Sequence, residues 1–445
     1  MDAAARFFEK REARPLLIIA VFLPAIFAFG LLYRKAFSLP YQDDYKVILA
    51  FAGEYRDSSS WATKALAIAT RQNNNYKLAF EHFIVALELE FLGHLNFGVL
   101  VALGDLCLLP IAYLLWRTHQ GEQRTHRTDG GVNQGLISFL PISLIFFSLT
   151  YWETLNWAMA GLQNLPVIMF SLLSIFCLIP VPPGSERRPR VFLACLAAVL
   201  ATLSSANGFL LAPFGFIALY RRRAFAACGL WCACFLPPLA AYLYHYERPP
   251  FLAKWTSAAF YGQKIFYFFA FLGSAVPFAR GAALLGCALT IVFGLSIRWR
   301  FYQSHPVSFC STLWIFSTAG LVPWIRSEVA SRYSIYSILL LIFAYTFLSH
   351  HLPKRLPPIS SNHVYLASLV FAVLLCVCAD TLAYRWLGRR KQMVLTGIEH
   401  YRANPETNSP MIDPAVWKDF PKEAEIERVE LTKALRNHLL VLPPR

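Results

Sequence analysis

Two adjacent carboxylates, Asp43 and Asp44, lie in the segment "SLPYQDDYKVILAF" (38–51), a few residues after the first long apolar run. Neighbouring carboxylates repel each other, which raises the pKa of one of them or attracts a cation. Either effect would help to activate a hydroxyl group, so the pair is a candidate general base or metal site. A structural role is the alternative, because an aspartate here would also cap a helix beginning at "YKVILAFAG".

A second candidate is the segment "IRSEVASRY" (325–333), because arginine binds phosphate oxygens through a two-pronged fork. Arg326 or Arg332 could hold a phosphate, with Glu328 and Tyr333 beside them. The same residues could instead form an ion pair and anchor the chain at the level of the lipid headgroups. The sequence leaves both interpretations open.

A third polar junction, "YWETLNWAMAGLQN" (151–164), combines aromatic rings with hydrogen-bonding groups. Tryptophan could stack on a sugar ring, although a belt at the membrane interface is its commoner role. Amide and carboxylate groups would bind sugar hydroxyls. The candidate substrate-binding residues of this kind are Trp152, Glu153, Asn156, Trp157, Gln163 and, from "SSANG" (204–208), Asn207.

The elements that must position these residues are predicted to be membrane helices. Of the 445 residues 57% are hydrophobic and only 15% are charged, whereas a soluble domain carries about a quarter charged residues. The net charge of +15 is divided into short basic clusters between apolar runs, which is typical of cytoplasmic loops and not of a nucleic-acid-binding stripe. The ten cysteines lie mostly in apolar runs and are interpreted as small hydrophobic residues.

The composition and the runs predict an all-α, polytopic helical membrane protein with about eleven transmembrane helices, in a range of 10–13. The two short runs, 191–204 and 208–220, are predicted to form a hairpin because arginine clusters flank both outer ends. The fifteen residues 265–279 suit a re-entrant or interfacial helix better than a crossing. The eleven runs are 15–33, 95–116, 135–150, 161–180, 191–204, 208–220, 224–244, 281–297, 306–323, 333–349 and 361–379.

The chain is predicted to consist of a cytoplasmic N-terminus (1–14), a transmembrane domain (15–380) and a soluble helical tail (381–445). The basic residues before the first run place the N-terminus inside, so the first loop, 34–94, lies outside. Basic residues at the start of the tail favour an inside tail and so oppose eleven crossings. We keep eleven because the polar junctions then share one face.

Within the first loop, "SSSWATKALAIATR" and the following amphipathic segment are each predicted to be helical, the second lying on the membrane surface. Its apolar stripe is Phe80, Ile84, Leu87 and Phe91, with Glu81 and Glu88 on another face. Asp105, inside the second run, should face the protein interior. "HHLPKR" (350–355) is interpreted as a cytoplasmic loop, because two adjacent histidines do not both point comfortably at one ion.

At this point the arrangement resembles the GT-C superfamily of integral-membrane glycosyltransferases, which use polyprenyl-phosphate sugars, and in particular its poorly characterised bacterial branch. The resembling motifs are "PYQDDY", Trp152 to Trp157 followed by Gly161-Leu162-Gln163, and Ser331-Arg332-Tyr333. They are short and spread over most of residues 1–380. Such relatives often have an acid and a basic pair where this chain has "NNNYK" (73–77).

The resemblance implies an inverting hexosyl- or pentosyltransferase of the bacterial cytoplasmic (inner) membrane, with its active site on the extracytoplasmic face. Asp43 would be the base, Asp44 would orient it or bind a divalent cation, and Arg326 or Arg332 would hold the lipid phosphate. The implied partners are a polyprenyl-phosphate sugar donor, membrane lipids and a glycan, lipid or protein acceptor. No other cofactor and no nucleic acid is expected.

Two other functions compete with this expectation. A lipid-linked glycan transporter, or flippase, would use the same arginines and apolar grooves without chemistry. An envelope polymerase or ligase would place its critical residues in a large late outer loop, whereas the largest outer loop here is the first.

Overall fold

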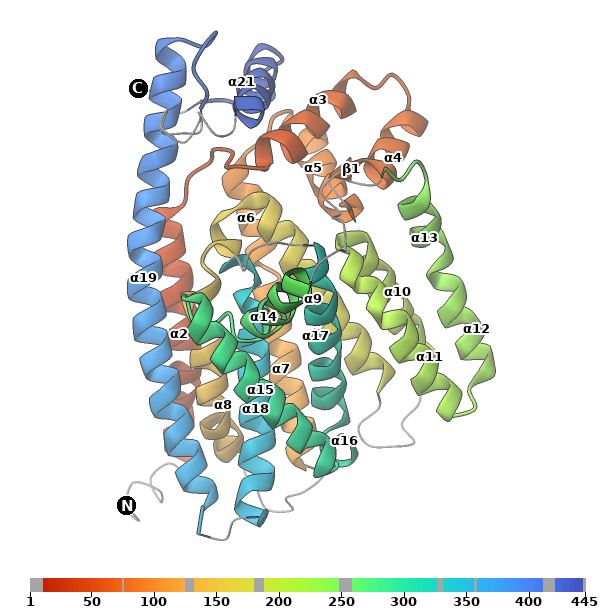
Figure 1. Cartoon of the computed structure of the whole chain (residues 1–445), viewed down its shortest axis with the longest axis vertical. Helices are drawn as coiled ribbons and strands as arrows, with labels where there is room; N and C mark the ends of the chain where they lie inside the picture. Colours follow the sequence, from red (N-terminus) through yellow and green to blue (C-terminus); the bar gives the residue numbers. More distant parts are fainter. Residues whose placement is uncertain are drawn as a thin grey trace.

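The computed structural model describes residues 11–73, 76–124, 132–179, 188–247, 258–325, 331–355, 358–410 and 421–442. Within these ranges the helices are joined by turns and short loops, and the strands are one short antiparallel pair. Most long helices run along the vertical axis of Figure 1. The all-α prediction is confirmed. The elements are η1 Arg11–Ala13, α2 Arg14–Lys35, η2 Tyr45–Leu49, α3 Ala50–Asp57, α4 Trp61–Thr70, β1 Gln72–Asn73, β2 Tyr76–Lys77, α5 Ala79–Leu92, α6 Phe97–Asp105, α7 Leu108–Arg124, α8 Val132–Phe146, η3 Leu149–Tyr151, η4 Thr154–Asn156, α9 Ala158–Leu178, α10 Arg188–Ser204, η5 Ala206–Leu210, α11 Leu211–Arg221, α12 Phe225–Cys234, α13 Leu236–Leu243, α14 Ala258–Leu272, α15 Ala279–Arg298, α16 Phe301–Ser304, α17 Pro306–Ile325, η6 Ser331–Tyr333, α18 Ser334–Arg355, α19 Ser361–Ala403 and α21 Pro421–Arg436.

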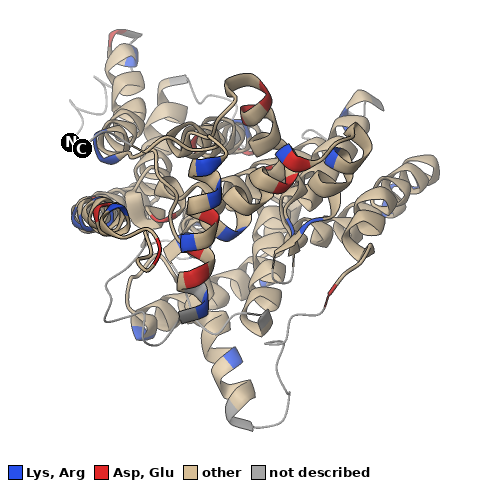
Figure 2. Ribbon diagram, turned by 90° about the horizontal axis from the view of Figure 1, so that it is seen from above, with Lys and Arg blue, Asp and Glu red and all other residues tan. Residues whose placement is uncertain are grey.

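Nine helical segments of the described chain are long and apolar enough to cross a membrane. Their outward side chains are apolar as well: Ile26 is 65% exposed, Leu284 74% and Leu374 60%. Exposure of such apolar surfaces to water would be unfavourable, whereas contact with lipid chains is favourable. Charged residues are sparse along the ribbon (Figure 2). The chain is therefore a multi-pass helical membrane protein. The nine segments are Arg14–Lys35, Phe97–Glu122, Asn133–Tyr151, Ala158–Leu178, Phe225–Leu243, Ala279–Arg298, Pro306–Trp324, Ser331–Arg355 and Ser361–Ala403.

The helices α10 and α11 form the hairpin that the flanking arginines predict, and both are shorter than a full span. The hairpin turns through η5, where a Cβ at Gly208 would lie only 2.4 Å from the backbone carbon of Ala201, so glycine is needed there. Arg222, just after α11, donates to the carbonyl of Leu178 at the end of α9 (2.8 Å). The hairpin thus returns to the end of the bundle at which α9 finishes.

The stretch predicted not to cross, 265–279, begins in the second half of α14, a helix of fifteen residues, and continues through the turn that leads into α15. This helix is foreshortened in Figure 1, whereas α15 and α17 beside it are seen lengthwise. Tight glycine contacts fix the turn into α15: a Cβ at Gly273 would lie 1.9 Å from the carbonyl oxygen of Ala282, and one at Gly286 1.8 Å from that of Phe269. The short helix therefore packs directly against α15 without a full span of its own.

The first loop and the C-terminal tail lie together at one end of the molecule (Figure 1). The backbone N–H of Leu95 donates to the carbonyl of Leu439 (2.7 Å), and Arg56 donates to that of Asn437 (2.8 Å). The long α19 carries the chain there, since its 43 residues exceed the roughly 20 needed to span a bilayer. The basic residues at the start of the tail are thus on the loop's side. The predicted helix "DPAVWKDF" (413–420) lies outside the described residues.

The helix α5 has the two faces expected from the sequence, and the acidic face is the buried one. Phe91 is 82% exposed, whereas Glu81 is 0% and Glu88 5% exposed. An apolar stripe outside and acids inside suits a helix whose outer face contacts lipid. The second span also behaves as expected, because Asp105 is buried in the interior.

The placement of the loop and the tail on one side can be tested by cysteine labelling. On a cysteine-free background, Ser59→Cys in the loop and Thr407→Cys in the tail should both react with a membrane-impermeant maleimide added to intact cells. Gln303→Cys, at the other end, should react only after permeabilisation. All three positions are exposed. A tail cysteine that behaves like Gln303→Cys would contradict the shared side.

Candidate functional site

Arg390 of α19 lies at the centre of a buried cluster of aromatic and acidic side chains, and it is 3% exposed. Its Nη1 donates to the carbonyl of Asn156 (3.0 Å), and its Nη2 lies 3.8 Å from Oε1 of Glu153. The guanidinium carbon is 3.9 Å from the ring centroid of Tyr41 and 4.7 Å from that of Trp152. One arginine therefore joins α19 to the first loop and to the 151–157 junction.

Glu153 brings together two segments that the sequence presents 178 residues apart. Its Oε2 accepts from the hydroxyl of Ser331 and from the backbone N–H of Arg332 (3.2 Å). The hydroxyl of Thr154 donates to the carbonyl of Arg332 (2.9 Å). These contacts hold η6 against the 151–157 junction, so two of the three candidate segments form one site.

The guanidinium of Arg332 lies over two aromatic rings, at 5.2 Å from the Trp157 centroid and 5.4 Å from that of Tyr333. Its charge interacts with those of Glu153 and Asp43. The ion pairs found in the described part of the chain include none with Arg332 at 4.0 Å or less. This half-buried arginine is thus placed where an anion could meet its fork.

Asp44 is buried and caps a distant helix. Its Oδ1 accepts from the N–H of Met159 in the first turn of α9 (3.0 Å), and its Oδ2 accepts from the N–H of Tyr41 (2.9 Å). Trp157, the residue at the N-cap of α9, provides no side-chain cap, so Asp44 supplies it from another segment. Burial raises the pKa of Asp44 to about 7, although both N–H donors oppose the rise. The helix that Asp44 caps is thus α9, not its own η2.

Asp43 has different surroundings from its neighbour. It is half-buried, and its charge interacts with Asp44, Arg332 and Glu81. The turn before it contains Gln42 with a positive φ of 46°. Of the acidic pair, Asp43 is therefore the carboxylate that remains accessible for chemistry.

Glu81 is a third acid at this place, and the sequence interpretation assigned it no role in the site. It is fully buried, and neither carboxylate oxygen has a hydrogen-bond partner among the residues that the structure describes. Burial, then the charges of Asp44 and Asp43, raise its pKa well above the usual range. Next to it, His82 stacks on Phe51 with ring centroids 4.4 Å apart. The sequence did contain an indication of this role: Glu81 lies on the face of α5 opposite the apolar stripe, and a helix that contacts lipid through that stripe turns its other face toward the protein.

The remaining predicted residues lie around this centre. The rings of Trp152 and Trp386 stack at 6.2 Å with a 7° interplanar angle, and Trp157 is 1% exposed, so Trp157 presents no free face to a sugar. Gln163 is buried in α9. Asn207 donates to the hydroxyl of Tyr336 (3.0 Å) and thus belongs to the interior near α18. Arg326 and Glu328 lie outside the described residues.

Two large grooves flank α19, and one of them reaches the site. The first, of about 720 Å³, is lined mostly by apolar residues of α14, α15 and α19 and by Trp152, Ser331 and Trp386. The second, of about 830 Å³, lies between α2, α8 and α19 and is bordered by Arg34 and Arg385. Both are of a size that holds a lipid chain or a small molecule. Only the first is lined by residues adjacent to Glu153 and Arg332.

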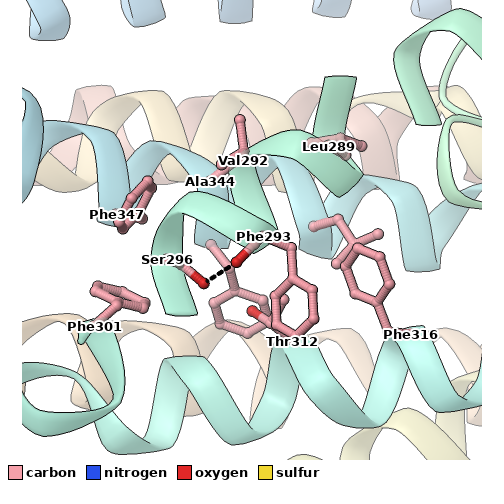
Figure 3. Close-up of a pocket in the computed structure, with 11 residues that line it drawn as sticks. Leu289, Val292, Phe293, Ser296, Phe301, Thr312, Phe316, Ala344 and Phe347 are labelled. Carbon is pink, nitrogen blue, oxygen red and sulfur yellow. Dashed lines mark hydrogen bonds between the residues drawn. The ribbon is translucent and has the colours of Figure 1, made fainter. Parts of the chain in front are cut away.

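A smaller cavity between α15, α17 and α18 offers no such site (Figure 3). Its volume is about 20 Å³, close to the space of one water molecule. Aromatic and aliphatic side chains form its wall, and the hydroxyl of Ser296 donates to the carbonyl of Phe293 in its own helix. Thr312 does the same with Ser308. This cavity is therefore excluded as a substrate site.

The fold and site define a multi-pass helical membrane protein with a carboxylate, an arginine and aromatic rings at the end of an apolar groove. Comparison with protein-family models, curated proteins and solved structures finds no significant match to the chain. The resemblance to GT-C enzymes thus rests on the short motifs in the sequence alone.

The buried acids of the first loop predict a pH-dependent stability. Burial raises the pKa of Asp44 and of Glu88 to about 7 and that of Glu81 well above its usual value. A raised folded-state pKa stabilises the fold below the unfolded pKa, and this stability is lost as pH rises through the folded pKa. The apparent Tm in detergent should therefore fall between about pH 5 and about pH 8.

Glu88→Gln should flatten this pH dependence, because glutamine keeps an acceptor for the N–H of Asn96 (3.2 Å) without a charge. Glu90→Gln is the matched control on the same helix, since its side chain is exposed and paired with Lys64. An identical slope in wild type and Glu88→Gln would contradict the assignment.

Proposed function

We propose that the protein is a membrane glycosyltransferase that moves a sugar from a polyprenyl-phosphate donor to an acceptor hydroxyl on the side of the first loop. The observation that carries this proposal is one arrangement: Glu153 holds the backbone of Arg332 (3.2 Å) within electrostatic reach of Asp43, and Ser331, next to Arg332, lines the large apolar groove. Such a groove suits the prenyl chain, and the arginine suits the phosphate at its end.

The proposed reaction is a single displacement at the anomeric carbon. Asp43 takes the proton of the acceptor hydroxyl while the oxygen forms its bond to that carbon. The bond between the anomeric carbon and the phosphate oxygen breaks, and its electron pair leaves with the lipid phosphate. The guanidinium of Arg332 stabilises the negative charge that develops there. The sugar's configuration is inverted.

In this mechanism Glu153 and Arg390 are positioning residues. Glu153 holds the backbone of Arg332 (3.2 Å), and Arg390 holds Glu153 (3.8 Å) and packs on Tyr41 (3.9 Å), close to Asp43 in the chain. The contacts of Arg390 and Glu153 thus position both the base, Asp43, and the phosphate-binding residue, Arg332. Asp44 acts through the fold, by capping α9.

A lipid transporter without chemistry is the second candidate, and the second groove favours it. Two lipid-sized grooves on the two sides of α19 could hold the same lipid before and after it moves. Transport, however, needs no proton acceptor at Asp43. Release of polyprenyl phosphate from a polyprenyl-phosphate sugar by the reconstituted protein would distinguish the two functions, because a transporter leaves the sugar–phosphate bond intact.

Blocking each groove separately tests which one takes the donor. Ala379→Trp, in the first groove, should lower kcat/KM for the donor by roughly tenfold or more, equivalent to about 1.4 kcal/mol. Thr381→Trp, two residues away on α19, fills the second groove and should stay near wild type. The readout is polyprenyl phosphate released in proteoliposomes, tested with a panel of polyprenyl-phosphate hexoses and pentoses. A loss confined to Thr381→Trp would overturn the groove assignment.

A further inference from the structure

Three histidines from distant parts of the sequence meet at the end of the bundle away from the first loop. His305 separates α16 from α17, and His350 and His351 lie in the last two turns of α18. His350 and His351 are therefore helical, not in a loop as the sequence interpretation held. One potential ligand nitrogen from each lies within 4.8 Å of the others. His305 is 1% exposed, and the other two are half-buried.

The sequence interpretation discounted His350 and His351 because two adjacent histidines do not both point comfortably at one ion. The third histidine changes this argument. The rings of His305 and His350 are 4.5 Å apart at 66°, and those of His350 and His351 4.8 Å apart at 72°. Rings that meet at steep angles direct their nitrogens toward a common region more readily than rings stacked face to face. The cluster therefore has the number and type of ligands of a three-histidine metal site.

The walls of the cluster are suited to holding such a site. Phe301 stacks on His305 at 4.7 Å, and Phe347 lies 5.3 Å from His351. Aromatic walls limit the access of water, and this strengthens the attraction between a metal ion and its ligands. The hydroxyl of Ser304 lies 2.8 Å from Nδ1 of His305 and 3.5 Å from Nε2 of His351, so it can orient the rings as outer-shell groups do.

We propose that His305, His350 and His351 bind a first-row divalent metal ion, with zinc the best fit, and that the ion links the α16–α17 turn to the end of α18. Imidazole is a preferred ligand of zinc, copper and nickel. Three protein nitrogens leave a fourth tetrahedral position for water. In tetrahedral zinc sites the ligand nitrogens are roughly 3.4 Å apart, so the side chains close in by about an ångström on binding.

Lys354 gives the proposal a specific consequence. Its Nζ lies 3.0 Å from Nε2 of His350, so an ammonium group occupies the position from which that nitrogen would reach the ion. The metal competes with Lys354 for His350 and is repelled by its charge. Lys354→Met should therefore tighten zinc binding, whereas loss of a ligand weakens it.

The site is independent of the proposed transfer reaction. α16 and the end of α18 lie at the bottom of Figure 1, and the first loop lies at the top. The nearby acid Glu122 is already engaged, since its carboxylate accepts from the N–H groups of Val307 (3.0 Å) and Ser308 (3.1 Å) at the start of α17. The ion would thus act on the fold at this end.

The test uses full-length protein purified through a tag without histidine. After incubation with zinc and dialysis, metal analysis should find one zinc per chain in wild type. His305→Ala and His351→Ala should each weaken zinc binding by about tenfold or more. His400→Ala, exposed at the other end, is the matched control and should bind like wild type. Cobalt, used as a spectroscopic probe, should show the strong visible absorption of a four-coordinate site.

Variants with opposite effects on zinc affinity separate a loss of binding from a loss of folding, because misfolding would only weaken binding. Lys354→Met should bind zinc more tightly than wild type, and added zinc should raise the apparent Tm of wild type and Lys354→Met but not of His351→Ala. Wild-type protein that binds no more zinc than His351→Ala would overturn the proposal. So would a loss of equal size in His400→Ala, or a weaker affinity in Lys354→Met.

Discussion

Asp43→Asn is expected to slow sugar transfer at least about a hundredfold, the lower end of what a positioned general base contributes. Asparagine has nearly the same size and can accept a hydrogen bond, but it takes no proton at neutral pH. The fold should survive, because the local helical contact to Val47 N–H is made by the backbone carbonyl of Asp43 (2.8 Å). Initial rates of polyprenyl phosphate release in proteoliposomes, with donor binding measured separately, check this result.

Asp44→Asn provides the control, because its neighbour is expected to act on stability. Asp44 accepts from Met159 and Tyr41 with two different oxygens, and asparagine has only one. Loss of a helix cap costs about 1 kcal/mol, so its apparent Tm should fall while the rate per folded molecule stays within a few-fold of wild type. If Asp43→Asn kept the wild-type rate, Asp43 would not be the base, and the transferase proposal would lose its main support.

The apolar runs and the charge clusters predicted most of the framework. Membrane-length hydrophobic segments are local features, so the nine long apolar helices of the described chain and the short hairpin formed by α10 and α11 could be recognised without any tertiary information. The eleven crossings remain a prediction. The short α14 was recognisable by its length for the same reason. The helical periodicity of α5 likewise placed Phe91 and Glu81 on different faces of the helix.

Sequence patterns could not show which contacts the polar residues make. The cap that Asp44 provides acts on a helix 115 residues away, and local pattern identified only the possibility of a cap nearby. The sequence placed Glu81 only on another face than the apolar stripe. Its burial without a hydrogen-bond partner among the described residues was not predicted, because burying an acid in this way is costly. His305 is separated from His350 by the whole of α17 and most of α18, which hid their meeting.

Arg390 is the residue whose role the sequence concealed most completely. The basic residues around it, "RWLGRRK" (385–391), indicated only that the start of the tail favours the cytoplasmic side. Its place depends on α19 continuing without interruption to Ala403, so that Arg390 reaches Glu153 and Tyr41.

Arg390→Met is therefore expected to be the most destabilising of these substitutions. Removing one partner of a buried ion pair costs about 3–5 kcal/mol, because the other charge is left unpaired. Here Glu153, the carbonyl of Asn156 and the face of Tyr41 would all lose their contact. We expect the apparent Tm, measured in detergent at one fixed scan rate, to fall by several degrees and transfer to fall with it.

The neighbouring arginine supplies the matched control for this prediction. Arg389 is exposed, with its guanidinium carbon 5.3 Å from the ring of Trp386, so Arg389→Met should leave the apparent Tm almost unchanged. Arg390→Lys should lie between the two, since lysine keeps the charge but loses the planar fork. If the ion pair with Glu153 carries the effect, adding Glu153→Gln to Arg390→Met should cost less than the sum of the two single changes. Strict additivity would assign the role of Arg390 to its packing between Tyr41 and Trp152 instead.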